Sequence, residues 1–152
     1  MSDRKDDNPD RAFIARVLEQ GLTEVDVDSS ALLRALKCQV VGARAGEVHL
    51  RFLPGAQYEQ GNGVVSGGII ATMLDFGMAF AGLTTCAEGE SVISVGLTVT
   101  YVAPVLCGPV LVEASLLSSG FRLSQAEARL TDTGGNLLAK ASSPLTMKRR
   151  RN

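Results

Sequence analysis

The stretch IIATMLDFGMAFAGL, residues 69–83, contains a single charged residue, Asp75. Such an apolar run predicts one long helix, extending over about residues 66–86, at the centre of the fold. A carboxylate inside a buried helix is costly unless it is paired or hydrogen-bonded. We therefore interpret Asp75 as a functional acid; the alternative is a core acid that accepts hydrogen bonds from the backbone of a neighbouring loop.

Two glycines, Gly67 and Gly68, stand just before this run. A glycine pair at the start of a helix lets a ligand approach the free backbone N–H groups closely. The alternative is that the two glycines only form a tight turn into the helix and bind no ligand. With Asp75 downstream, the pair favours a site in which an acid faces a polarised carbonyl.

Residues 69–87 are apolar enough to raise the question of a membrane span. Asp75 argues against it, because a carboxylate at the centre of a bilayer costs roughly 2.5–3.5 kcal/mol. Polar Thr84 and Thr85 lie near the end of the run, and no basic residues flank it. These features favour a core helix, apolar all round because the rest of the fold wraps it.

The other segments predict two short helices followed by strands. Residues 47–53 alternate cleanly, with Val48, Leu50 and Phe52 on one face, which is typical of a strand with one buried side. The predicted helices are residues 11–20 and 30–36, and the predicted strands are residues 37–43, 47–53, 91–103, 109–119, 123–132 and 137–147. Within the last strand, Pro144 is expected at an edge or a bulge.

Strands and helices do not alternate along the chain, which disfavours a doubly wound α/β fold. The pattern predicts an α+β fold, in which an antiparallel β-sheet wraps around one long hydrophobic helix, with short helices at the N-terminus. We expect residues 1–9 to be disordered, residues 10–148 to form one domain, and residues 149–152 to be a solvated basic tail.

The composition narrows the function. The net charge of −1 over 152 residues gives no reason to expect nucleic-acid binding, and no membrane partner is expected. The three cysteines, Cys38, Cys86 and Cys107, have no spacing typical of a zinc site or a disulfide framework, so no metal is expected. The first residues lack the apolar core of a signal peptide, so we expect a cytoplasmic protein.

A longer motif ties these residues together. Gln60-x-x-Gly63-x-x-Ser66-Gly67-Gly68, with Asp75 eight residues after Gly67, resembles the hotdog-fold acyl-CoA thioesterases of the PaaI and 4-hydroxybenzoyl-CoA thioesterase type. The segments SVGLTVTYVAPV (residues 94–105), GFR (120–122) and TDTGG (131–135) resemble later parts of the same family, and the resemblance covers about residues 35–147.

The resemblance implies roles for particular residues. Asp75 would be the catalytic carboxylate, as nucleophile or as general base, and the Gly67 N–H would polarise the thioester carbonyl. Gln60 would position water or substrate, and Ser94 would assist the attacking water. The expected substrate or CoA contacts are Ser66, Gly68, Asn62, Arg122 and Ser124, although Ser94 also fits an ordinary strand residue, and Arg122 and Ser124 also fit solvated turn residues.

The resemblance also implies an assembly and a substrate class. Family members are homodimers or dimers of dimers whose site lies between two chains, so the acid and the glycine would come from different protomers. The partner would be a small-molecule acyl-CoA, with no separate cofactor because CoA is part of the substrate. Met73, Phe76, Met78 and Phe80 are candidates for lining the acyl pocket, and the acyl group stays open.

One position departs from the family pattern. The family's usual His is Ser66 here, and the chain's one histidine, His49, belongs to the polar face of a predicted strand. We expect Ser66 to cap the helix through its hydroxyl. The departure motivates a second hypothesis, a non-catalytic acyl-CoA-binding hotdog protein; a hotdog dehydratase is disfavoured because those enzymes use a His with the acid.

Overall fold

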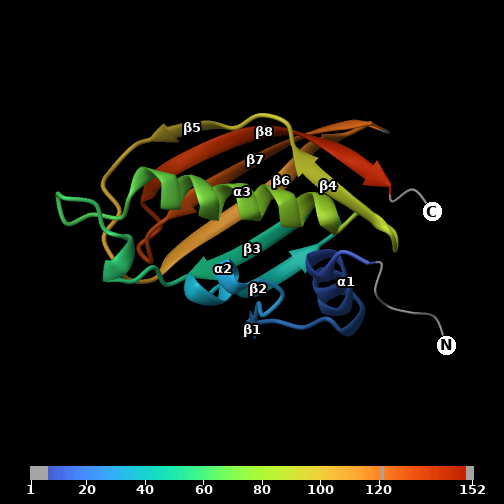
Figure 1. The fold of residues 1–152 in the computed structure, drawn as a ribbon, viewed down its shortest axis with the longest axis horizontal. Helices are drawn as coiled ribbons and strands as arrows, with labels where there is room; N and C mark the ends of the chain where they lie inside the picture. Colours follow the sequence, from blue (N-terminus) through green and yellow to red (C-terminus); the bar gives the residue numbers. More distant parts are fainter. Residues whose placement is uncertain (1–6, 121, 150–152) are drawn as a thin grey trace.

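A curved antiparallel sheet lies behind one long helix in the computed structural model, which describes residues 7–120 and 122–149 (Figure 1). The helices are α1 (Pro9–Gln20), α2 (Ala31–Ala35), the short 3₁₀ turn η2 (Ala56–Tyr58) and α3 (Gly67–Leu83). The strands are β1 (Val25–Asp26), β2 (Gln39–Arg44), β3 (Glu47–Phe52), β4 (Glu90–Ser94), β5 (Thr98–Tyr101), β6 (Val110–Ser119), β7 (Leu123–Thr131) and β8 (Leu137–Arg149).

The sheet has the strand order β1-β2-β3-β6-β7-β8-β4, and β5 also pairs with β8. The predicted antiparallel sheet around a central helix is therefore confirmed. Alternation in β3 has the expected effect, since Val48, Leu50 and Phe52 are fully buried. The two-residue strand β1 and the turn η2 have no periodic signal in the sequence and were not predicted.

Helix α3 packs against the sheet through Met73, Leu74 and Met78, which are fully buried. Its opposite side is less covered than predicted. Gly68 is exposed, and Thr72, Asp75 and Ala79 are partly exposed. Their spacing of four, three and four residues places them along one face. The helix is therefore wrapped on several sides, as expected, but one face stays partly open within a single chain.

The predicted strand 91–103 is interrupted. The chain forms β4 and β5 with a break at residues 95–97, where it passes Pro144 of β8. Proline has no N–H to donate to a ladder. The Val95 N–H still donates to the Pro144 carbonyl at 3.0 Å, but the Gly96 carbonyl takes its hydrogen bond from the Ser143 hydroxyl at 2.6 Å. Pro144 thus lies in an inner strand and not at an edge. Opposite it the register changes, because Ser94 pairs with Leu145 and Thr98 with Ser142, so residues 95–97 face only two residues of β8. This extra residue makes a β-bulge, so of the two expected positions the bulge is confirmed and the edge is wrong.

The ends of the domain are more ordered than predicted within the described residues. Helix α1 begins at Pro9, and the Asn8 side chain caps it by accepting hydrogen bonds from the Asp10 and Arg11 N–H groups. Strand β8 continues to Arg149, whose Nε lies 2.9 Å from Oε1 of Glu90. The predictions for residues 1–6 and 150–152 lie outside the described residues. Within residues 7–120 and 122–149, no helix is long and apolar enough to cross a membrane.

Candidate active site

Asp75 and Ser94 meet at the middle of α3. The Ser94 hydroxyl donates a hydrogen bond of 2.7 Å to Oδ1 of Asp75. Ser94 is the last residue of β4 and pairs with the buried Leu145 of β8, so its side chain points to the helix side of the sheet. The structure thus brings together two residues 19 positions apart that the sequence singled out separately. Asp75 is partly buried, because it lies on the less covered face of α3.

The N-terminus of α3 presents unused donors. Ser66 occupies the N-cap position, but its side chain makes no capping hydrogen bond, so the predicted capping interaction is wrong. The Ser66 carbonyl accepts from the N–H groups of Ile69 and Ile70 at 3.0 and 3.1 Å. No protein acceptor for the Gly67 or Gly68 N–H is found among the described residues, so both can donate to a ligand.

A tyrosine that the sequence reading did not single out lies against the first of these glycines. The Tyr101 hydroxyl donates to the Gly67 carbonyl at 2.7 Å. A Cβ added to Gly67 would lie 3.1 Å from the Tyr101 hydroxyl oxygen and 3.2 Å from its Cζ, so a side chain at this position would require Tyr101 to shift by a few tenths of an ångström. Tyr101 belongs to the quoted segment SVGLTVTYVAPV, but only its place beside the helix in space reveals the contact.

Gln60 and Asn62 lie together in the loop that leads into α3. The Asn62 N–H donates to Oε1 of Gln60 at 2.7 Å. Glu59 pairs with Val65 as an isolated β-bridge, and the Ser66 N–H donates to the Tyr58 carbonyl at 2.9 Å. The loop is therefore closed on itself at the helix N-terminus, with Gln60 and Asn62 exposed at its tip.

Gly67 and Asp75 are separated along α3. Eight residues of α-helix correspond to about 12 Å along the axis. One thioester carbonyl cannot lie within hydrogen-bond reach of the Gly67 N–H and also within attacking distance of Asp75 in the same chain. A single chain therefore contains two separate halves of the predicted site: the donor half at Gly67 and the acid half at Asp75, about 12 Å apart along the helix.

Arg122 and Ser124 lie on neither of these halves. Arg122 is exposed at the turn between β6 and β7. Ser124 and Ser94 both pair with Leu145, from opposite sides of β8, so they are two strands apart, or roughly 10 Å. His49 hydrogen-bonds to Glu47 at 2.9 Å on the outer face of β3, away from α3.

The cysteines are poor candidates for a nucleophile. All three are free thiols. Burial raises the pKa of Cys38 well above its usual range and that of Cys86 to about 11, and the hydrogen bond to Glu59 raises the pKa of Cys107. Since the thiolate is the reactive form, these shifts leave Asp75 as the better candidate. Among the described residues, no cluster of three or more His, Cys, Asp or Glu side chains could hold a metal ion.

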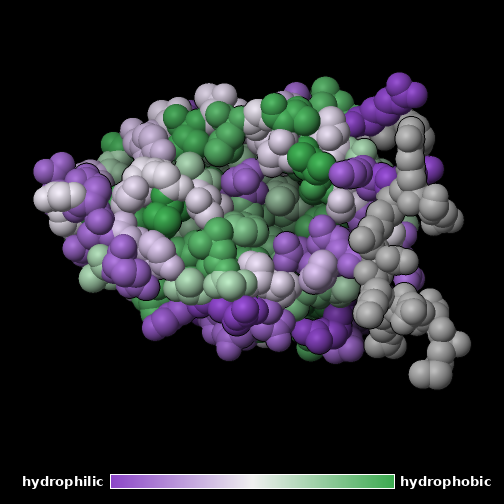
Figure 2. Space-filling view, viewed as in Figure 1, coloured by the Kyte–Doolittle hydropathy of each residue, from purple (hydrophilic) through white to green (hydrophobic). Residues whose placement is uncertain are grey.

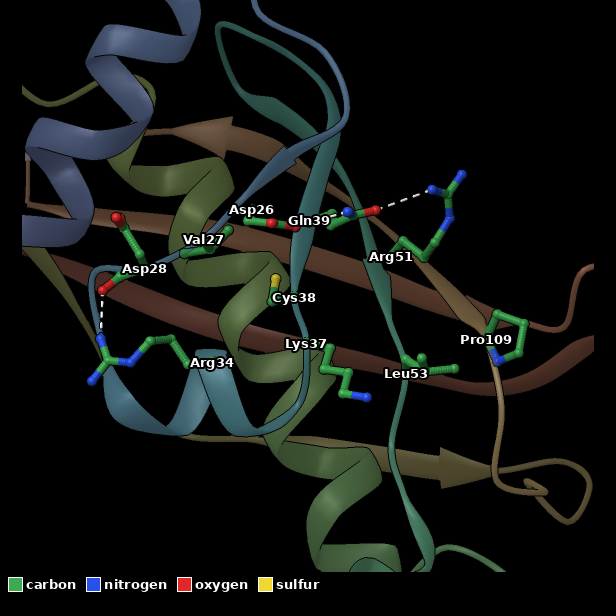
Figure 3. Close-up of a pocket in the computed structure, with 10 residues that line it drawn as sticks. All are labelled: Asp26, Val27, Asp28, Arg34, Lys37, Cys38, Gln39, Arg51, Leu53 and Pro109. Atoms are coloured by element: carbon green, nitrogen blue, oxygen red, sulfur yellow. Dashed lines mark hydrogen bonds between the residues drawn. The ribbon is translucent and has the colours of Figure 1, made fainter.

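A cleft of about 530 Å³ lies beside β1, α2 and the end of β3 (Figure 3). Its lining includes neither Asp75 nor Gly67. Three cations line it, but Figure 3 shows the side chains of Arg34, Lys37 and Arg51 pointing in different directions. Because their charged groups point apart, they do not form a binding site for one anion. The cleft is also separate from the candidate active site, since it contains neither Asp75 nor Gly67.

Comparisons with known proteins bear on the family and the fold of this chain. The sequence pattern of the thioesterase superfamily matches residues 62–139, just over half of the chain, and this range contains Gly67, Asp75 and Ser94. No curated protein matches the chain.

Several solved structures share the fold. A phenylacetic acid degradation-related protein from Ralstonia eutropha JMP134 superposes with a TM-score of 0.77 at 21% identity, covering 88% of this chain and 98% of that one. The PaaI protein of the Escherichia coli phenylacetic acid degradation operon has a TM-score of 0.71 at 15% identity, with 76% and 87% covered. Zebrafish thioesterase superfamily member 2 has a TM-score of 0.68 at 25% identity, with 76% and 83% covered.

The matched pattern and the shared architecture support thioester hydrolysis as the general reaction class. The sheet wrapped around α3 is the hotdog fold that the sequence predicted. On these grounds the chain belongs to the thioesterase superfamily.

Proposed function

We propose that this protein hydrolyses acyl-CoA thioesters, with Asp75 as the catalytic carboxylate and the Gly67 N–H as the donor to the thioester oxygen. The hydrogen bond from Ser94 to Asp75 is the observation that carries the proposal, because it holds a carboxylate on the accessible face of α3. A structural acid would be expected to share its oxygens with backbone N–H groups; Asp75 instead accepts a hydrogen bond from a serine hydroxyl and is partly exposed.

The chemistry follows from these groups. Attack on the carbonyl carbon places negative charge on its oxygen, and an N–H at a helix N-terminus stabilises that charge. In the water route, Asp75 takes a proton as water adds, the C–S bond breaks, and the CoA thiolate leaves and is then protonated. In the nucleophilic route, the Asp75 carboxylate adds to the carbonyl carbon, the C–S bond breaks, and the CoA thiolate leaves and is protonated; water then cleaves the resulting mixed anhydride, which releases the free acid and restores the Asp75 carboxylate. An acyl adduct on Asp75, found by mass spectrometry after rapid quenching, would identify the second route.

The active site of this proposal is shared between two copies of the chain. The distance of about 12 Å along α3 requires a second protomer to supply the glycine opposite each Asp75. Strands β4 and β5 pair only with β8 among the described residues, so their outer edge is open. Ile93, Val95, Leu97, Tyr101 and Val102 along this edge are each more than 40% exposed.

Figure 2 shows hydrophobic surface over α3 and the adjoining β4–β5 region, with hydrophilic residues gathered towards the rim. Exposed apolar surface of this kind and an open strand edge are both features of protein interfaces. Association of two copies through this edge would cover the apolar residues. We propose a homodimer, or a dimer of dimers, in which Gln60, Asn62, Ser66 and Gly68 contact substrate beside Gly67, and Arg122 and Ser124 contact CoA.

The proposal is tested with a panel of acyl-CoAs and detection of the free thiol. Asp75→Asn keeps the size of the side chain but removes the base and nucleophile, so turnover should fall by at least about 100-fold. Asp28→Asn is the matched control, because Asp28 is exposed in a different part of the fold and its carboxylate makes no hydrogen bond within the described residues. Equal turnover by the wild type and Asp75→Asn would remove Asp75 from the catalytic role.

The second candidate, a non-catalytic acyl-CoA-binding protein, is favoured by one observation. Ser66 replaces the family's usual His and makes no capping hydrogen bond. Tight binding of acyl-CoA without release of thiol would support this candidate. Light scattering after size exclusion measures the oligomeric state, and a strict monomer would contradict the shared site.

A further inference from the structure

Tyr101 crosses the start of α3 from β5. Its hydroxyl donates to the Gly67 carbonyl at 2.7 Å, and its ring lies against the glycine at the place where a side chain would begin. About half of the residue is exposed, so the contact is at the surface of the site and not within the core.

This hydrogen bond fixes the direction of one N–H. A peptide group is planar and trans, so the carbonyl of Gly67 and the N–H of Gly68 point in opposite directions from the same plane. The preceding peptide is held in another way, because the Ser66 carbonyl accepts from Ile69 and Ile70. The Gly67 carbonyl also belongs to the helix's own i to i+4 ladder. Tyr101 therefore adds a side-chain anchor to the peptide that carries the Gly68 N–H.

The backbone at Tyr101 is held against β8 by strand pairing and hydrogen bonds. Tyr101 pairs with Ala139 of β8, which is fully buried. The next two N–H groups, of Val102 and Ala103, both donate to the Leu138 carbonyl, at 2.8 and 3.1 Å. Glycine gives the helix start more conformational freedom than any other residue would. The hydrogen bond from Tyr101 to the Gly67 carbonyl restricts that freedom.

We propose that Tyr101 is a positioning residue for catalysis: it holds the Gly67–Gly68 peptide so that the Gly68 N–H joins the Gly67 N–H as a second donor to the thioester oxygen. The assignment rests on the proposed function. Donors that are already aimed at the developing charge lower the barrier more than donors that must reorient during the reaction.

The first test compares Tyr101→Phe with Tyr58→Phe. Each removes one hydroxyl, but the Tyr58 hydroxyl has no hydrogen-bond partner among the described residues. We expect Tyr101→Phe to lower kcat about three- to tenfold, the effect of one net hydrogen bond, with KM unchanged. The control should keep wild-type kcat. An unchanged kcat in Tyr101→Phe, while the wild type is active and Asp75→Asn is not, would overturn this assignment and leave the proposed function intact.

The second test does not depend on turnover. In an Asp75→Asn background, the infrared band of a ¹³C-labelled thioester carbonyl reports how strongly the donors polarise it. Binding should move the band to lower wavenumber, and adding Tyr101→Phe should reduce that displacement, whereas adding Tyr58→Phe should not. If the band moved by the same amount in Asp75→Asn with and without Tyr101→Phe, the positioning role would be overturned. A wild type that neither binds nor hydrolyses acyl-CoA would overturn both proposals.

Discussion

Ser94 has one hydrogen-bond partner that matters for the proposed chemistry, Oδ1 of Asp75. Its hydroxyl limits how the carboxylate can rotate, and in the proposed mechanism it would assist the attacking water. We expect Ser94→Ala to lower kcat about tenfold, since positioning and proton transfer in such sites contribute about 100-fold or more in total. Steady-state kinetics with the best acyl-CoA substrate would measure the effect.

The matched control is Ser91→Ala in the same strand. Ser91 is three residues earlier in β4, so its side chain points to the opposite face of the sheet. It should retain wild-type activity. A loss as large as that of Ser94→Ala would mean that β4 responds to any serine replacement, and the contact with Asp75 would no longer explain the effect.

At this scale the sequence singled out residues but not the contacts between them. Asp75 and Gly67 could be chosen because a charge or a glycine in or beside an apolar run is conspicuous, whereas Ser94 was indicated only by the resemblance to the thioesterase family. The bond between Asp75 and Ser94 depends on the pairing of β4 with β8, and the contact of Tyr101 with Gly67 depends on the path of β5 across the helix. The capping role expected of Ser66 was wrong because its side chain does not reach the first-turn N–H groups.

Among the elements, α3 and β6 make a close helix–sheet contact at Gly77. A Cβ there would lie 2.7 Å from Cγ1 of Val112 and 3.3 Å from Cβ of Ala114. Alanine gains up to about 1 kcal/mol of helix propensity over glycine, but overpacking a core costs about 1–3 kcal/mol. Because Val112 is stiff and fully buried, we expect Gly77→Ala to lower the free energy of unfolding by about 1–2 kcal/mol in urea denaturation.

A double substitution checks this explanation. Val112→Ala removes the atom that the new methyl group would strike. Gly77→Ala combined with Val112→Ala should therefore lose less stability than the two single changes added together. If the changes in the free energy of unfolding were strictly additive, a steric clash between the new methyl group and Val112 would not explain the loss.

Helix α1 is attached to the start of β4 through a carboxylate. Asp7 accepts from Nε of Arg11 at 2.7 Å and from the Gly89 N–H at 3.2 Å. The hydrogen bonds from Arg11, chiefly, and from Gly89 hold the pKa of Asp7 below its ordinary value of 3.8. Asp7→Asn should lower the free energy of unfolding by about 1–2 kcal/mol near neutral pH, as for other hydrogen bonds to a charged group.

The dependence on pH has a definite sign. A lowered pKa in the folded state stabilises the protein fully above the unfolded pKa, and the contribution is lost as the pH falls through the folded value. The difference between wild type and Asp7→Asn should therefore shrink as the pH falls below 3.8. Denaturation curves at several pH values measure it, and a difference that grows in acid would contradict the role of the ionised carboxylate.

Element boundaries show where local signals are sufficient. The alternation in 47–53 and the glycine-rich turn at 133–136 identified β3 and the β7–β8 hairpin, because these depend on neighbouring residues. The break between β4 and β5 did not follow from its own β-branched sequence. It follows from Pro144, about 50 residues later, which lies opposite it only in the folded sheet.

For the whole molecule, the shared site makes a quantitative prediction. Asp75→Asn and Gly67→Ala should each be nearly inactive alone. In a twofold dimer, a heterodimer of the two has one site with both defects and one site with none. An equal mixture that re-associates at random should therefore recover about one quarter of wild-type activity.

The control mixes Asp75→Asn with Ser94→Ala. Both defects lie on the acid half, so every site that lacks Asp75 is inactive and no fully intact site can form on the other chain. Activity should stay near the average of the two variants. No recovery in the Asp75→Asn and Gly67→Ala mixture, with dimers present, would show that each chain works alone.

The overall architecture was the most predictable property of all. One long apolar helix and several alternating strands leave few ways to bury the helix other than a sheet around it. The exposed face of α3 was not predictable, since the sequence pattern cannot distinguish burial within a chain from burial between chains.

The interruption at residues 95–97 has a consequence for colloidal behaviour. A long straight strand at the rim of a sheet would offer a template to any extended polypeptide, which is how fibrils begin. Here the open rim consists of two short segments, Glu90–Ser94 and Thr98–Tyr101, separated by a bend. An extended chain cannot pair with both segments without bending at the same place. The bend, which the sequence did not predict, therefore disfavours edge-to-edge pairing into fibrils.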